Sequence, residues 1–76
     1  MDIEIDAQSR LTIIEQIVGQ TERLVADGKL KTGDILPSVK ELADRLQISR
    51  RTTMKAYEEL CGKGIAEHRA GQYLIY

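Results

Sequence analysis

The sequence has a single cysteine, Cys61, and a single histidine, His68. One cysteine excludes a disulfide framework and a paired CxxC metal site, and we interpret Cys61 as a reduced thiol on a helix. One histidine, with no second ligand and no nucleophile at a fixed spacing, makes neither a metal site nor a covalent catalytic arrangement. The glycines form neither GxGxxG nor GxxxxGKS/T, so the sequence lacks a nucleotide cradle. We therefore expect a protein without enzymatic activity, metal or cofactor.

Long apolar runs are also missing. None approaches the ~20 residues that a helix needs to cross a bilayer, so no membrane partner is expected. The start of the chain, Met1–Glu4, is acidic and lacks the basic-then-apolar layout of a signal peptide. The chain has 76 residues, of which 42% are hydrophobic and 30% charged, the balance of an ordinary globular domain. These features predict one domain that is located in the cytoplasm.

Basic residues have no overall excess, since the net charge is −1. Their distribution is uneven: residues 1–37 hold four Lys and Arg against seven Asp and Glu, whereas residues 38–76 hold seven against five. The stretch from Arg45 to Tyr57 has four basic residues and no acidic one. Because salt screens each charge within roughly 8 Å, binding to a polyanion requires a local positive face and not a basic protein. Such a cluster is also typical of a solvated surface, so by itself it indicates no function.

The first third of the chain predicts an extended arm followed by a helix. Ile3 and Ile5 alternate with acidic residues, as in an extended segment with one apolar side. A helix of about sixteen residues follows, and Gly28 is its natural end because a positive φ is least costly there. Both Ser9 and Thr12 are suitable N-caps, and the sequence leaves the choice open. The apolar stripe of this helix comprises Leu11, Ile14, Ile17, Val18, Thr21, Leu24 and Val25.

Two further helices are predicted in the middle of the chain. Ser38 and Glu41 form a capping box at the start of one, and Ser49 caps the other. Gly62 and Gly64 end the second of them. A tight turn of about three to four residues separates the two, which is the spacing of a helix-turn-helix unit. The inward faces comprise Val39, Leu42, Ala43 and Leu46 in the first helix, and Thr53, Ala56, Tyr57, Leu60 and Cys61 in the second.

A β-hairpin is predicted after the helices. Residues 65–68 and 73–76 have the pattern of two strands, and residues 69–72 join them with Gly71 at the tip. A two-stranded hairpin is barely stable alone, so we expect it to pack on the helices beside Leu36, which precedes a proline and is therefore extended. The predicted fold class is α+β, a winged helix-turn-helix of three helices with a small antiparallel β-hairpin as the wing. Its core is expected to include Ile17, Leu42, Leu46 and Leu60.

The helix that begins after Ser49 carries the strongest functional signal. In a helix-turn-helix, the start of the second helix enters the major groove of DNA. Arg50 and Arg51 stand there although helices prefer acids in the first turn, and arginine can pair with guanine through two parallel hydrogen bonds. Thr52 offers a hydroxyl and a methyl, and the free N–H groups of a helix start suit a phosphate. The alternative is that both arginines are solvated charges.

Further contacts are expected on either side of that helix. Lys40, near the start of the preceding helix, can reach the phosphate backbone that this helix crosses. Arg69 and Gln72 flank Gly71 at the tip of the wing and are candidate DNA contacts, with an ordinary polar hairpin tip as the alternative. We expect His68 to be exposed or near a phosphate.

Several segments resemble the GntR family of bacterial transcription regulators. Residues 28–43 resemble its signature G-x-L-x-P-G-x-x-L-P-S-x-R-x-L-A. Residues 48–52, 56–60 and 64–65 are similar to its second half, V-S-R-x-T-V-x-x-A-Y-x-x-L-x-x-x-G-L-I. Residues 3–17 are similar to the short-tailed YtrA-like branch. The resemblance covers nearly the whole chain.

This resemblance implies a homodimeric repressor that binds a palindromic operator in duplex DNA. Met54 stands where the family often has arginine, which makes Lys55 the candidate substitute for that contact, and Gln47 replaces the usual turn glycine. Family members continue into a second domain that dimerises and binds a small-molecule effector. We expect residues 1–76 to be the DNA-binding domain alone, with that second domain absent. The contacts implied by the family fall on Lys40, Ser49 and Gly71 for phosphates and on Arg50, Arg51 and Thr52 for bases.

Two other functions are compatible with this fold class. A winged helix can serve as a protein-interaction module, since the fold alone determines no function. Such a module would more often show an apolar or acidic recognition helix than the run Arg50–Thr52. A replication or partition initiator shares the DNA chemistry, and only the location of its binding site would separate it from a transcription regulator.

Overall fold

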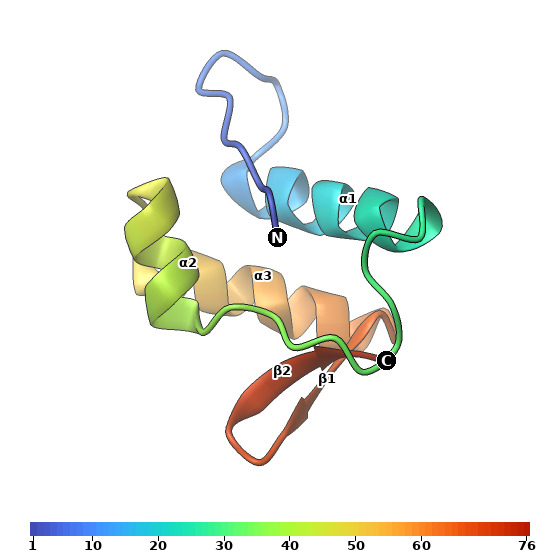
Figure 1. The fold of residues 1–76 in the computed structure, drawn as a ribbon. Coiled ribbons are helices and arrows are strands. Elements are labelled where there is room, and N and C mark those ends of the chain that lie inside the picture. The colour runs from blue at the N-terminus through green and yellow to red at the C-terminus, as the bar shows by residue number, and fades with distance from the viewer.

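Three helices and a hairpin surround a shared core in the computed structural model, which describes residues 1–76. They are α1 (Ile13–Ala26), α2 (Val39–Leu46), α3 (Arg50–Gly62), β1 (Ala66–Arg69) and β2 (Gln72–Ile75). In Figure 1, α1 lies above α3, α2 packs at the end where α3 begins, and the hairpin lies below α3. This order of elements confirms the predicted winged helix-turn-helix. None of the three helices has the length and apolar character to cross a bilayer.

The start of α1 settles the choice between two N-caps. Thr12 is the cap: its Oγ1 accepts a hydrogen bond from the N–H of Glu15 at 3.1 Å, and the Glu15 carboxylate accepts one from the N–H of Thr12 at 2.9 Å. Ser9 instead closes a turn, where its Oγ accepts a hydrogen bond from the N–H of Leu11 at 3.1 Å. The helix therefore has 14 residues, fewer than predicted. Leu11 precedes the cap and is 53% exposed, so its predicted place in the buried stripe is wrong.

The two middle helices begin where their caps predicted. Ser38 and Glu41 form the capping box of α2, and Ser49 caps α3. The turn between the helices contains Gln47, which adopts a left-handed φ of 57°. That conformation costs a residue with a side chain roughly 1 kcal/mol or more, which is why glycine is common at such a position.

The core draws on every element and on the arm. Ile17, Leu42 and Leu60 are fully buried, as predicted, whereas Leu46 is only partly buried. A domain of this size has few residues to exclude water, so each of the buried ones matters for stability. The buried apolar cluster comprises Ile3, Ile17, Val18, Leu36, Leu42, Ala56, Tyr57, Leu60, Ala66 and Ile75.

Two threonines lie among these apolar residues, and both hydroxyls have partners. Thr21 Oγ1 donates to the carbonyl of Ile17 at 2.8 Å, and Thr53 Oγ1 donates to the carbonyl of Ser49 at 3.1 Å. Each bond reaches one turn back in the same helix. A buried hydroxyl without a partner would cost roughly 1–3 kcal/mol, so these bonds are what allow threonine in the interior.

Each strand of the hairpin differs from its prediction by one residue, because β1 and β2 both lie one residue closer to the turn. β1 and β2 pair antiparallel, and Arg69 lies opposite Gln72 in the last pair. Only Ala70 and Gly71 form the turn, with φ of 52° and 79°. Positive φ at both positions is what a two-residue type I′ turn requires. The predicted loop of residues 69–72 was therefore too long.

The extended segment before α2 attaches the hairpin to the body of the domain. The N–H of Leu36 donates to the carbonyl of Tyr73 at 2.8 Å, and the N–H of Ile75 donates to the carbonyl of Asp34 at 2.9 Å. Ile35 forms an antiparallel bridge with Leu74. These bonds confirm that the wing packs beside Leu36.

The N-terminal arm is held against α1 by two glutamine side chains. The Gln16 amide accepts a hydrogen bond from the N–H of Asp6 at 2.8 Å and donates one to the Asp6 carbonyl at 3.1 Å. The Gln20 amide does the same with Glu4, at 3.0 Å and 2.6 Å. Each glutamine amide thus bonds to the main chain of the arm as a neighbouring strand would. Ile3 of the arm is buried. The alternating isoleucines predicted the extended arm but not this clamp.

Candidate nucleic-acid interface

The start of α3 presents free hydrogen-bond donors to solvent. Ser49 Oγ accepts from the N–H of Thr52 at 3.0 Å and donates to Thr52 Oγ1 at 2.8 Å. The Thr52 hydroxyl, which accepts that bond, retains its own hydrogen for an outside acceptor. The backbone N–H groups of Arg50 and Arg51 have no partner within the chain. The positive end of the helix dipole therefore lies open, as an anion site requires.

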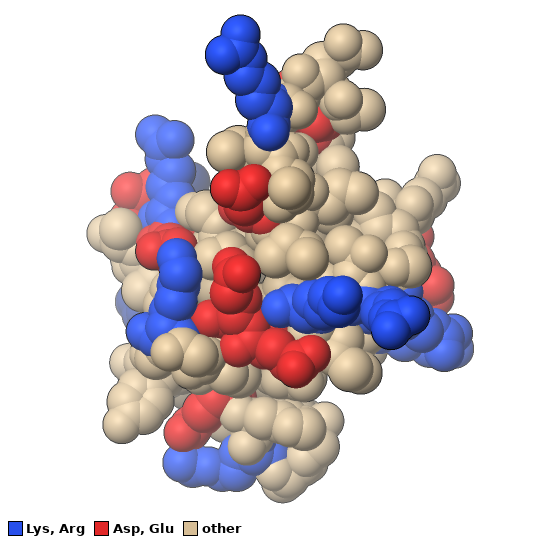
Figure 2. Space-filling model, turned by 180° about the vertical axis from the view of Figure 1, so that it is seen from behind, with Lys and Arg blue, Asp and Glu red and all other residues tan.

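Exposed cations surround this helix start. Arg50, Arg51 and Lys55 are all exposed, and none of them takes part in an ion pair. No acidic residue occurs in the first turn of α3. Figure 2 shows Lys and Arg side chains gathering at the right-hand edge, where α2 and the start of α3 lie, while acidic side chains occupy the middle of that face. The basic face is local, as the charge distribution predicted.

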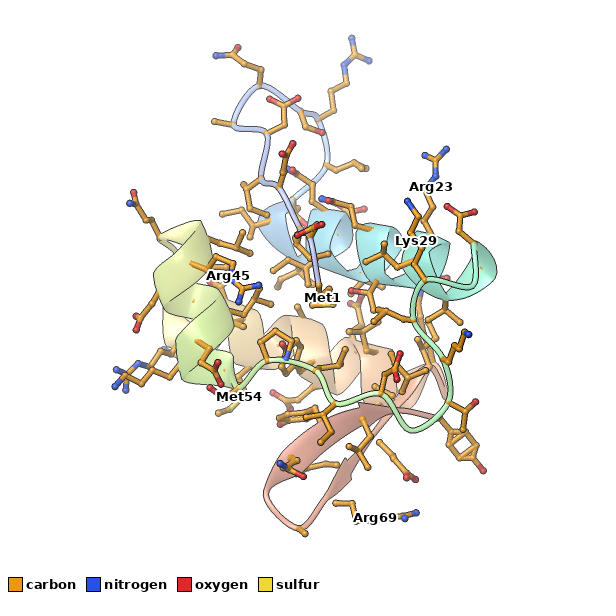
Figure 3. All side chains as sticks on the ribbon, in the orientation of Figure 1. Met1, Arg23, Lys29, Arg45, Met54 and Arg69 are labelled. Carbon is orange, nitrogen blue, oxygen red and sulfur yellow. The ribbon has the colours of Figure 1, made fainter.

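Arg45 does not belong to this basic face, although the sequence places it in the same run of charges. Its guanidinium donates to the carbonyl of Met1 at 3.1 Å, and Figure 3 shows the two residues facing each other. Arg45 thus fastens the end of the arm to α2.

The beginning of α2 and the tip of the wing line one cleft. This cleft has a volume of about 330 Å³, and it brings Lys40 together with Gly71 and Gln72 across some thirty residues of sequence. Glu41 also lines the cleft, but its carboxylate is engaged by the N–H of Ser38 at 3.3 Å. The remaining lining residues are Ile35, Leu36, Ser38, Val39 and Tyr73.

Arg69 lies apart from this cleft. Its guanidinium forms an ion pair with Glu67 at 2.8 Å, and its side chain is 71% exposed. In Figure 3 it projects from the lower edge of the hairpin, away from the helices. The structure therefore groups the wing residues differently from the sequence, which placed Arg69 and Gln72 symmetrically about Gly71.

Tyr57 connects α3 to the segment before α2 and to the wing. Its hydroxyl donates to the carbonyl of Pro37, immediately before α2, at 2.6 Å. Its ring packs on Tyr73 of the wing, with ring centroids 4.7 Å apart. His68 stacks on the other ring of that pair, Tyr73, at 4.4 Å and is itself exposed. Burial raises the pKa of Tyr57 well above its usual range, so the hydroxyl stays a neutral donor.

The sequence predicted Tyr57 only as a buried residue of the α3 stripe. A buried tyrosine nearly always has a partner for its hydroxyl, and this general requirement was the available signal. The identity of that partner depends on how α2 crosses α3, which the periodicity of a single helix does not contain.

Comparison with known proteins shows which family the chain resembles. Residues 13–72 match the family model of "Bacterial regulatory proteins, gntR family". The HTH-type transcriptional repressor YtrA of Bacillus subtilis is 44% identical over 70 residues, which cover 92% of this chain and 54% of that protein. The chain thus spans about half the length of this relative.

Solved structures agree with the sequence match. YtrA from Sulfolobus acidocaldarius, a GntR-family transcription factor, is 40% identical, with a TM-score of 0.92 over 96% of this chain and 78% of that one. AraR(DBD) in complex with operator ORE1 is only 19% identical but has a TM-score of 0.81 over 100% of this chain and 94% of that one, so it shares the fold. The chain therefore belongs to the gntR family of bacterial regulatory proteins and forms the winged helix-turn-helix DNA-binding domain of that family.

Proposed function

We propose that this domain binds a specific operator in duplex DNA, with the start of α3 in the major groove, and that it serves a transcriptional repressor. The observation that carries the proposal is the pair Arg50 and Arg51, exposed and without an acidic partner directly after the Ser49 cap. Cations at a helix start oppose the helix dipole and destabilise the helix by a few tenths of a kcal/mol each or more. A bound polyanion interacts favourably with both the arginines and the positive end of the dipole, and so offsets that cost.

The residues have distinct roles in this proposal. Arg50, Arg51 and Thr52 read base edges, because the first turn of α3 is the part that reaches the groove floor. Lys55, one turn further, supplements them. Phosphates are held by Lys40 and by the main chain at Ser49, Gly71 and the free N–H groups of the helix start, with Gln72 beside them in the cleft.

Arg69 is paired with Glu67 in the free domain, and a phosphate can either replace that carboxylate or accept from the remaining N–H donors of the guanidinium. An exposed ion pair contributes about 0–1 kcal/mol, so a phosphate can replace Glu67 at little cost. Before DNA binds, the Arg69 side chain is therefore in an ion pair, whereas those of Arg50 and Arg51 are in none.

Assembly follows from the geometry of helix-turn-helix operators. Two copies of a gntR regulator would place their α3 helices in successive major grooves, about 34–36 Å apart, on a palindromic site. We assign dimer formation and effector binding to a domain outside residues 1–76, and we place the complex on the nucleoid in the bacterial cytoplasm. The Bacillus relative supports a further domain by its length, since the match covers only 54% of it, and its name supports the role of repressor.

The proposal is tested by separating base contacts from phosphate contacts. A duplex selected by the chain from a random library serves as the probe, with a scrambled duplex beside it. Arg50→Ala should lose roughly 1–3 kcal/mol on the selected duplex and relax the preference at one base pair. Lys40→Ala should weaken both duplexes about equally, because phosphate contacts carry no sequence information.

Arg23→Ala is the matched control, since Arg23 is an exposed arginine on α1, far from the start of α3 in Figure 3. It should change neither affinity. If Arg50→Ala and Arg51→Ala lower the affinity for selected and scrambled duplexes equally, binding is not sequence-specific and the proposed function is wrong.

A further inference from the structure

Met54 is the one large apolar side chain of α3 that the fold leaves exposed. It is 47% exposed, while the other large apolar residues of the helix, Tyr57 and Leu60, are fully buried. Met54 packs neither within the buried cluster nor against it. In Figure 3 it projects below α3, on the side where the hairpin lies. The monomer therefore gains little stability from an apolar residue at this position.

The neighbours of Met54 on the exposed side of α3 are all charged. Arg50 and Arg51 lie one turn before it, and Glu58 lies one turn after it. An apolar side chain among charges is unfavourable in water, but it can be favourable against a surface that itself offers an apolar group. Methionine also adapts its shape to such a surface, because its side chain is unbranched and flexible.

Only one substituent that the bases present on the floor of the major groove is an apolar carbon group. The C5-methyl of thymine is exposed there, whereas the other base edges present hydrogen-bond donors and acceptors. The helix rises about 1.5 Å per residue, so Met54 lies about 6 Å along the axis from Arg50. This separation corresponds to about two base-pair steps of 3.4 Å each.

We infer that Met54 is a specificity residue that reads a thymine by contact with its C5-methyl, about two base pairs from the base read by Arg50. The inference rests on the proposed function, because it requires the start of α3 to lie in the major groove. Under this inference the domain recognises its operator in two ways, by hydrogen bonds from the arginines and by an apolar contact from Met54.

The test removes the methyl without altering any hydrogen bond. In the duplex selected by the chain from a random library, each thymine is replaced in turn by deoxyuridine, which keeps the O4 acceptor and the pairing with adenine. For the natural chain, one such replacement should weaken binding about fourfold, the factor expected for loss of one buried methyl. In Met54→Ala that replacement should have no further effect, and in Met54→Leu the methyl dependence should be retained.

Leu11→Ala is the matched control, because Leu11 is a similarly exposed apolar residue that precedes α1 and belongs neither to the helix-turn-helix nor to the wing. It should show the same methyl dependence as the natural chain. All three variants alter exposed residues, and far-UV circular dichroism verifies their folds.

If the duplex is bound specifically but the effect of deoxyuridine is independent of residue 54 at every thymine, the inference about Met54 is wrong and the proposed function stands. If the library yields no duplex bound in preference to random DNA, the proposed function itself is wrong, and the inference falls with it.

Discussion

The hydroxyl of Tyr57 offers the sharpest test of how α3 is held against the segment before α2. It donates to the carbonyl of Pro37 at 2.6 Å and so ties the middle of α3 to the beginning of α2. Tyr57→Phe keeps the ring, and with it the packing on Tyr73, but leaves the Pro37 carbonyl without this donor. The substitution therefore isolates a single hydrogen bond.

The expected loss can be worked out from the surroundings of that bond. A buried acceptor left without a partner costs roughly 1–3 kcal/mol, and partial access of water to Pro37 places the value at about 1–2 kcal/mol. A chain of this length has roughly 4–11 kcal/mol of total stability. At about 4–8 °C per kcal/mol for a domain of this size, the melting midpoint should fall by about 5–15 °C.

Thermal unfolding followed by far-UV circular dichroism measures this shift. Tyr76→Phe is the matched control, because Tyr76 is 68% exposed and its hydroxyl makes no hydrogen bond. Its midpoint should equal that of the natural chain. If Tyr57→Phe melts at the same temperature as Tyr76→Phe, the link between α3 and α2 contributes no stability, and the reasoning fails.

The same hydroxyl predicts a dependence on alkaline pH. Burial raises the pKa of Tyr57 in the folded chain, whereas in the unfolded chain it titrates at about 10. The unfolded state therefore loses this proton first, so the stability contributed by Tyr57 should be constant below pH ~10 and fall above it. In Tyr57→Phe the fall should be smaller, with the remainder owed to Tyr73 and Cys61, whose pKa values burial also raises.

Three further predictions concern affinity, the core and the arm. The logarithm of DNA affinity should fall with the logarithm of salt concentration by about 0.9 per phosphate neutralised, and a slope near zero in a filter-binding titration would contradict the phosphate contacts. Leu42→Ala should destabilise the domain by roughly 2–5 kcal/mol and unfold much of it at 37 °C, so an intact circular dichroism spectrum would contradict the core assignment. Gln16→Ala should free the arm at Asp6 while α1 to α3 remain folded, because that amide makes both hydrogen bonds to Asp6 and a third to Leu11. Hydrogen exchange at the Asp6 amide should accelerate, and an Asp6 amide that stays protected would contradict the role of Gln16.

The arm explains why the basic stretch of the sequence is only partly available to a ligand. The guanidinium of Arg45 donates to the carbonyl of Met1, which leaves the cations of α3 as the part of that stretch without a partner in the chain. In Figure 1 the arm lies on the α1 side of the domain, whereas the hairpin lies on the other side of α3.

Much of this fold was predictable because its determinants are local in the sequence. Ser38 and Ser49 start helices by bonding to the backbone three residues later, and that spacing is visible in the sequence itself. The stripes at helical spacing likewise predicted which faces of α2 and α3 are buried, and the position of the arginines relative to the Ser49 cap predicted the exposed helix start. The strands of the hairpin were one residue out, because a two-residue turn had to place Ala70, and not only Gly71, at positive φ.

What the tertiary structure alone decided are contacts between residues far apart in the chain. The bond from Tyr57 to Pro37, the pairing of Gln16 with Asp6 and the cleft shared by Lys40 and Gly71 all depend on how the elements cross. Periodicity reports which face of an element is buried but not which neighbour covers it, because any apolar neighbour satisfies the same pattern. The helix that we propose to read DNA was therefore evident from local signals, whereas the surface around it required the packing of α2, the wing and the arm.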